Sequence, residues 1–255
     1  MARERGISTQ LALAYETDYG TAPVSGFSRI PFIGSTISTT QELIEDDLLG
    51  LGRDPREPLL DPTTSDGDIT IPIEATSIGF WLKALFGSAT STDNGDGTYT
   101  HEWDSGAFVL PSLSIEVGMP SIPRYEMFQG CMADTLSFQM ARTGQLTGTV
   151  SLVAQSSSPK NASQAGPLTE LSRQRFGHVH GGITRDGSLL ASVVSADVSY
   201  SNNLDRVETI RSDGLIDGAD PSRATLTGQI VTRFATTTLI DQATQGKPAE
   251  VSFAY

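Results

Sequence analysis

The chain has 255 residues, of which 18% are charged, and a formal net charge of −13. This length fits one or two domains, and the charge excludes a protein that grips nucleic acid through lysine and arginine contacts to phosphate. The single cysteine, Cys131, excludes an intrachain disulfide. We find neither a signal-peptide segment nor the ~20 apolar residues that span a bilayer. We therefore expect a subunit that is made in a reducing cytoplasm and binds no membrane itself.

Residues 1–34 are predicted to form an N-terminal arm followed by a strand. Leu11, Leu13 and Tyr15 alternate with other residues, as they do along a strand with one buried face. The sequence Gly20-Thr21-Ala22-Pro23 then breaks the alternation.

The next region, residues 35–68, is predicted to be a long acidic loop. It shows no steady period, and Pro55, Pro58 and Pro62 argue against a helix or a central strand. From residue 41 to residue 68 it carries nine acidic residues and two arginines, hence a charge of −7. Its large apolar residues are too many for a purely solvated tract, so we expect a loop that binds a neighbouring subunit or ring. A solvated, partly disordered insertion is the alternative.

The residues that we assign to assembly lie around the middle of this loop. They are Leu43, Ile44, Asp46, Asp47, Leu48, Leu49, Leu51, Arg53, Arg56 and Leu59. The carboxylates of the loop need basic partners on a neighbouring copy. The candidates on other segments are Arg124, Arg173, Arg175, Arg206 and Arg211.

A strand and then a helix are predicted after the loop. Residues 69–74 are typical of a strand, and Thr76 or Ser77 can cap a helix that runs to Phe86, with Gly87 just past its end. The apolar stripe of this helix consists of Ile78, Trp81, Leu82 and Leu85. We expect this stripe to dock onto a β-sandwich.

Four later runs alternate between apolar and polar residues with the period of a strand. They are 134–140, 145–152, 195–200 and 224–234. The apolar set is Leu136, Phe138, Met140, Leu146, Val150, Leu152, Ala196, Val198, Tyr200, Leu226, Ile230 and Phe234. The polar set is Thr135, Ser137, Gln139, Gln145, Thr147, Thr149, Ser151, Asp197, Ser199, Thr225, Thr227 and Gln229. The pattern predicts one set in a core and the other on an exposed sheet face.

The sequence holds no convincing catalytic or metal site. In the acidic turn at 93–97 the third and fifth positions are glycines, where a calcium loop needs oxygen ligands. His178 and His180 lack a third ligand nearby, and neither a Gly-x-Ser-x-Gly elbow nor a phosphate loop occurs. We therefore expect no catalytic residue, no metal and no cofactor, and we disfavour a β-sandwich hydrolase.

Several short motifs occur in an order that resembles the tail tube proteins of long-tailed bacteriophages, the siphophage tail tube family. The first is Leu11-Ala12-Leu13-Ala14-Tyr15-Glu16, followed by Tyr19-Gly20-Thr21-Ala22-Pro23, Gly52-Arg53-Asp54-Pro55, Asp66-Gly67-Asp68 and Gly79-Phe80-Trp81-Leu82-Lys83. The later ones are Gly97-Thr98-Tyr99-Thr100-His101, Leu110-Pro111-Ser112-Leu113, Tyr200-Ser201-Asn202-Asn203-Leu204 and Ile216-Asp217-Gly218-Ala219-Asp220-Pro221. The resemblance runs over most of the chain.

This resemblance implies an all-β subunit with a structural function. It implies one tail-tube domain over residues 1–255, with a β-sandwich or barrel at 69–255, a flanking helix at 77–86 and the long loop at 35–68 stacking the subunits. Six copies would close a ring around a 24-stranded inner barrel lined by the polar set, and rings would stack into the virion's tail tube.

The resemblance also implies the partners of such a tube. The tube would hold the tape-measure protein, meet tail terminator and distal tail proteins at its ends, and pass viral DNA without specific binding. The subunit would be made in the cytoplasm of the bacterial host. A receptor-binding or decoration β-domain of the virion is the alternative.

Overall fold

The computed structural model describes residues 5–45, 53–54, 56–176, 181–234 and 236–255. These residues form mainly antiparallel strands, which confirms the all-β class, together with two α-helices and the short 3-10 helix η1 (Gly6–Ser8). Two main sheets share one long strand, β9 (Arg124–Ala141). A bulge in its pairing with β10, opposite Ser151 and Leu152, interrupts the ladder, and bulges of this kind bend a strand. β9 therefore belongs to both sheets.

The first sheet has the order β2-β1-β8-β9-β11. Its strands besides β9 are β1 (Gln10–Tyr15), β2 (Ser28–Arg29), β8 (Leu113–Met119) and β11 (Ser156–Lys160). The second sheet has the order β17-β14-β9-β10-β5, and β5 also pairs with β3 and β4. These strands are β3 (Gly34–Ser35), β4 (Ser38–Ile44), β5 (Leu59–Pro72), β10 (Thr147–Ala154), β14 (Val193–Ser201) and β17 (Thr225–Thr232).

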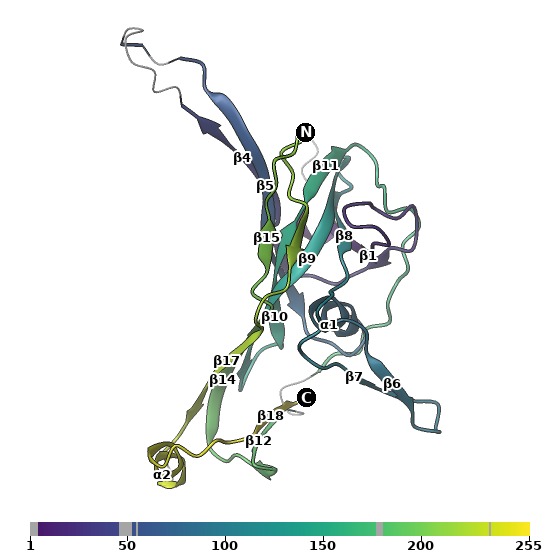
Figure 1. Ribbon diagram of the computed structural model, residues 1–255. Coiled ribbons are helices and arrows are strands. Elements are labelled where there is room, and N and C mark those ends of the chain that lie inside the picture. The colour runs from purple at the N-terminus through teal and green to yellow at the C-terminus, as the bar shows by residue number, and fades with distance from the viewer. Residues whose placement is uncertain (1–4, 46–52, 55, 177–180, 235) are drawn as a thin grey trace.

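The core lies between the sheets and helix α1 (Ile78–Phe86), which packs on one side of them (Figure 1). Trp81 and Leu85 are fully buried there, and Ile78 and Leu82 are half-buried against the same cluster. The N-cap residue is Ser77 and not Thr76, and the Ser77 side chain makes no capping hydrogen bond. At the other end Gly87 has a φ of +89° and donates its amide to the Lys83 carbonyl at 2.9 Å, a conformation that favours glycine.

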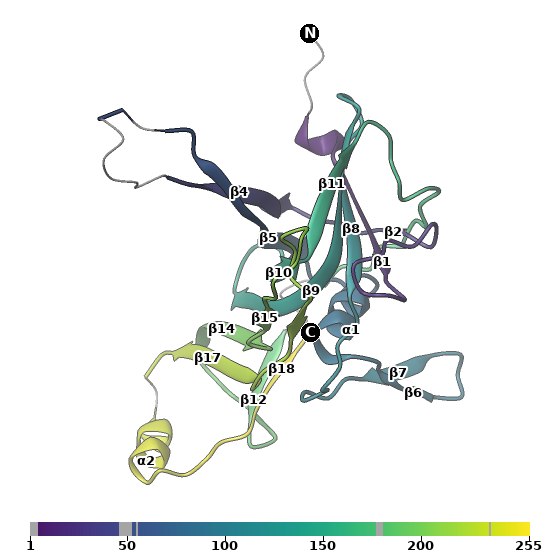
Figure 2. The ribbon, with the colours of Figure 1, turned by 45° about the horizontal axis from the view of Figure 1, so that its top comes forward.

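Smaller sheets surround this framework. β6 (Thr90–Asp93) and β7 (Tyr99–Glu102) form a hairpin that projects beyond α1, as both views show (Figures 1 and 2). The other small elements are β12 (Gly182–Arg185), β13 (Ser188–Leu189), β15 (Asp205–Val207), β16 (Gly218–Asp220), α2 (Thr238–Thr244) and β18 (Val251–Ala254). β12 pairs with both β13 and β18, so the last strand has a partner within the chain.

The prediction of an irregular loop over 35–68 is wrong, because much of this region is a long β-hairpin. β4 pairs with the first half of β5, and the second half of β5 pairs with β10. Pro62 lies where the β4–β5 register shifts, between the pairs Gln41–Thr63 and Leu43–Leu60. A bulge on an outer strand tolerates a residue without an amide proton, which is why proline did not exclude the strand. We call the hairpin from residue 38 to residue 64 the arm. It is distinct from the N-terminal arm that the sequence predicts within residues 1–34.

Candidate assembly surfaces

Strand pairing places most of the predicted polar set on one face of the second sheet. Thr227, Ser199, Ser137 and Thr149 lie directly opposite one another on successive strands β17, β14, β9 and β10. Parallel rows hold other members of the set, together with Ser201. They are Thr225, Ser201, Thr135 and Ser151 in one row and Gln229, Asp197 and Gln139 in another. Thr147 is the first residue of β10, two positions before Thr149, and lines a surface hollow together with Gln139 and Asp197. Paired residues of neighbouring strands point to the same side, so these rows form one continuous face.

The face is wider than the sequence predicts, because β5 extends it. Thr70 lies opposite Thr149, and Asp68 lies opposite Ser151 and accepts a 2.6 Å hydrogen bond from its hydroxyl. The four-stranded face expected from the alternating runs is thus five strands wide. Sequence reasoning missed Asp68, Thr70 and Ser201, although 68 and 70 alternate with the buried Ile69 and Ile71. Gln145 precedes β10 in an exposed turn and lies outside the rows.

The charge on this face is slightly negative. Its rows contain Asp197 and Asp68 but no lysine or arginine. Gln139 donates to Asp197 across β9 and β14 at 2.8 Å, which holds that carboxylate against the sheet. A phosphate-bearing polymer would meet hydroxyls and amides here and would find no cation to pair with.

The opposite face is buried over three of the four predicted runs. Leu136, Val150 and Ala196 are among its buried residues. On β17 the prediction of a core face is wrong for Leu226, which is 70% exposed, and for Phe234, just beyond the strand, which is 76% exposed. Ile230 is half-buried and packs against the core cluster that contains Met140. β17 pairs only with β14 among the described strands. Its other edge therefore carries free amides and carbonyls, which can pair with another chain.

The arm exposes both apolar and acidic side chains. Leu43, Ile44, Leu59 and Leu60 are each at least half exposed. Arg53 and Arg56 are exposed as well, whereas Asp46, Asp47, Leu48, Leu49 and Leu51 lie outside the described residues. Exposed leucines gathered on one projecting element are typical of a surface that is covered in an assembly.

Three of the arginines expected to bind a neighbour's carboxylates already have partners in their own chain. Arg124 lies 3.9 Å from the Glu126 carboxylate. Arg206 pairs with Asp66 of β5 at 2.5 Å. Arg211 pairs with Asp213 at 2.7 Å and also with Asp217. The hydrogen bond from the Arg211 guanidinium lowers the pKa of Asp213 to about 2. Arg206 and Arg211 line a cavity of about 600 Å³ together with residues 61–65 at the base of the arm.

Neither a metal cluster nor a membrane-spanning helix is found among the described residues. No three His, Cys, Asp or Glu side chains among them lie close enough to hold a metal ion, and none of their helices is long and apolar enough to cross a membrane. Cys131 is fully buried, and burial raises the pKa of its thiol well above the usual value. What the surface does present is a polar sheet face, a free strand edge and a projecting arm.

Comparison with known proteins gives one decisive match. The family model described as "Phage tail tube protein" matches residues 6–255. No curated protein sequence matches the chain. A solved structure that aligns with it is a chain of the anti-feeding prophage baseplate, determined by cryo-electron microscopy and symmetrised six-fold. Its identity is 9% and its TM-score 0.41, over 60% of this chain and 91% of that one, a likeness too remote to bear on function.

The family match covers nearly the whole chain, so it establishes the family. Its members are structural, generally non-enzymatic components of the virion tail that associate with themselves and with other tail proteins. This chain belongs to the phage tail tube protein family.

Proposed function

We propose that this chain is the major tube subunit of a long, non-contractile phage tail. Six copies form a ring, stacked rings form the tube, and the polar face of the second sheet lines a channel for DNA. The observation that carries the proposal is the registered polar face, which is continuous over five strands and has no lysine or arginine in its rows.

The dimensions of such a ring suit a DNA channel. Four strands from each of six copies make a barrel of 24, and ~4.8 Å per strand at ~40° tilt gives a diameter of roughly 48 Å. Counting β5 as a fifth strand widens it to roughly 60 Å. Inward side chains remove about 8 Å, and a DNA duplex roughly 20 Å wide passes in either case. Ring closure would use the free edge of β17.

The chemistry of the face suits passage rather than binding. Each phosphate contact by lysine or arginine strengthens the hold on DNA, and the rows provide none. Asp68 and Asp197 repel phosphates and keep the duplex from the wall. The same lumen would hold the tape-measure protein before ejection, while tail terminator and distal tail proteins would meet the ends of a tube built from subunits made in the host cytoplasm.

Placing cations on the face tests the proposal. Virions carrying Thr147→Lys with Thr227→Lys should assemble normal tubes but eject DNA more slowly, most strongly at low salt. The matched control carries the same change at Thr90 and Thr92, which are exposed on the β6–β7 hairpin, and should eject at the wild-type rate. Unchanged ejection by the first variant would contradict the channel assignment. Electron micrographs of purified protein without rings or tubes would contradict the proposal as a whole.

A further inference from the structure

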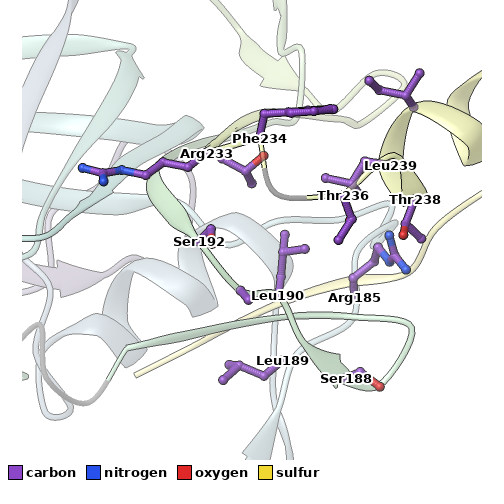
Figure 3. Close-up of a pocket in the computed structure, with 13 residues that line it drawn as sticks. Arg185, Ser188, Leu189, Leu190, Ser192, Arg233, Phe234, Thr236, Thr238 and Leu239 are labelled. Carbon is purple, nitrogen blue, oxygen red and sulfur yellow. The ribbon is translucent and has the colours of Figure 1, made fainter.

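The end of the molecule away from the arm carries two adjoining cavities. One, of about 310 Å³, lies between the β12–β13 hairpin, the end of β17 and helix α2 (Figure 3). The other, of about 630 Å³, shares residues 189–192 and Arg233 with the first. We call the two together the basal groove. Figure 3 shows Leu190, Phe234 and Leu239 around the first cavity, with Arg185 beside α2.

The basal groove combines apolar walls with positive charge. Leu189 and Phe234 are about three-quarters exposed, and Ile240 is 54% exposed. Its described lining residues include three arginines, Arg142, Arg185 and Arg233, and no aspartate or glutamate side chain. Arg185 also pairs with the adjacent Asp186 at 3.4 Å, outside the lining. The groove thus suits an occupant that is both apolar and acidic.

The arm has these complementary properties. Its exposed apolar residues, Leu43, Ile44, Leu59 and Leu60, are flanked by Glu42, Glu45, Glu57 and Asp61. Two arginines of the arm, Arg53 and Arg56, leave it net acidic. In both views the arm and α2 lie at opposite ends of the molecule (Figures 1 and 2), so an arm cannot reach the groove of its own chain.

We propose that the arm of one subunit seats in the basal groove of a subunit in the next ring. This inference rests on the tube proposed above and identifies the receiving surface for its stacking. A contact between two different patches at opposite ends of a subunit is heterologous, and such contacts repeat without closing when they run along an axis. The leucines fill the apolar cavity, and the acidic residues face the arginines.

Cysteine cross-linking tests the contact directly. Leu59→Cys combined with Leu239→Cys should give a ladder of covalently linked chains when assembled tubes are oxidised and run without reductant. Cys131 does not interfere, because it is buried. The control pair Leu59→Cys with Thr100→Cys, whose second site lies on the exposed β6–β7 hairpin, should remain monomeric. A ladder from the control as strong as that from the first pair, or no ladder from the first pair in intact tubes, would overturn the inference.

Charge reversal separates stacking from ring formation. Arg185→Glu with Arg233→Glu should leave rings intact but shorten tubes at least ten-fold at low salt. Adding Glu42→Arg and Glu45→Arg should restore tube length, because the attraction is re-established with opposite signs. Full-length tubes from the first variant, or loss of its rings, would each contradict the groove as the stacking site. Absence of rings from the wild-type protein would instead contradict the proposed function.

Discussion

Two β-hairpins project from the body of this subunit, and they differ in what they expose. The arm, from β4 and β5, presents leucine, isoleucine and carboxylates to solvent. The β6–β7 hairpin also carries carboxylates, but its other exposed side chains are mainly threonine, serine and histidine, with Tyr99 as its one large exposed apolar residue. Its turn is closed by its own side chains, since Asp93 accepts the Gly95 amide at 2.8 Å and Asp96 accepts the Thr98 amide at 3.0 Å.

This difference is the reason why we propose that assembly uses the arm. Exposed leucines cost free energy in water and are retained where a partner covers them. A polar hairpin that satisfies its own turn has no such need and can remain solvated in the tube. We therefore expect the arm to form an interface and the β6–β7 hairpin to remain solvated. The following experiments test this difference between the two hairpins.

The largest effect should come from removing each hairpin in turn. Deleting residues 42–60 should leave a folded subunit that forms no long tubes, because the apolar anchors are lost. Replacing the β6–β7 tip, residues 92–100, by a two-residue Asn-Gly turn should leave tube length unchanged. Electron microscopy measures both. Full-length tubes from the arm deletion would move the stacking contact to the strand edges.

The free energy of unfolding of the subunit should depend mainly on the core around Trp81 and little on either hairpin. Trp81→Ala should lower the free energy of unfolding by about 3–5 kcal/mol, because the ring is fully buried. Trp81→Phe is the matched control and should cost less, since it keeps most of the volume and removes an indole N–H that has no hydrogen-bond partner. Leu59→Ser on the arm should change stability by less than about 0.5 kcal/mol. Denaturant unfolding of the monomer gives all three values.

Assembly should protect one hairpin from protease and leave the other exposed. Chymotrypsin has sites at Leu59 and Leu60 on the arm and at Tyr99 on the second hairpin. In monomers all three are accessible once the strands open locally. In tubes cleavage at Leu59 and Leu60 should fall well below the monomer rate, while cleavage at Tyr99 persists. Equal protection at both places would mean that the β6–β7 hairpin is also an interface.

The smallest expected effects are those of lowering the pH on two hydrogen-bonded carboxylates. Hydrogen bonds from Thr98 lower the pKa of Asp96 in the second hairpin, and those from Arg211 lower the pKa of Asp213 near the arm base to about 2. A lowered folded-state pKa means that the stabilising contribution is complete above the ordinary value near 4 and is lost as pH falls through the folded value. The protection factors of the Thr98 and Leu215 amides, which are exchange rates corrected for the intrinsic effect of pH, should therefore fall as the pH is lowered from about 4 toward about 2. Thr98→Ala should return the Asp96 titration toward its ordinary range.

Local sequence determined much of this molecule. The alternation in the runs 134–140, 145–152 and 195–200 was enough to separate a core face from a polar one, because side chains of a strand point to opposite sides in turn. The apolar stripe around Trp81, closed by Gly87, was enough for the helix, since its period of 3.6 and its C-cap need no distant partner.

Only the tertiary structure decided how these pieces meet. The pairing of Thr70 with Thr149, which widens the polar face, and the arm itself depend on residues far apart in the chain finding a register. The prolines of the arm were misleading, because their effect depends on whether a strand lies at an edge or a bulge. The basal groove likewise gathers Arg142, Arg185, Arg233 and α2 from separate segments. No local pattern encodes a surface of this kind, because its charge and shape arise only when the chain is folded.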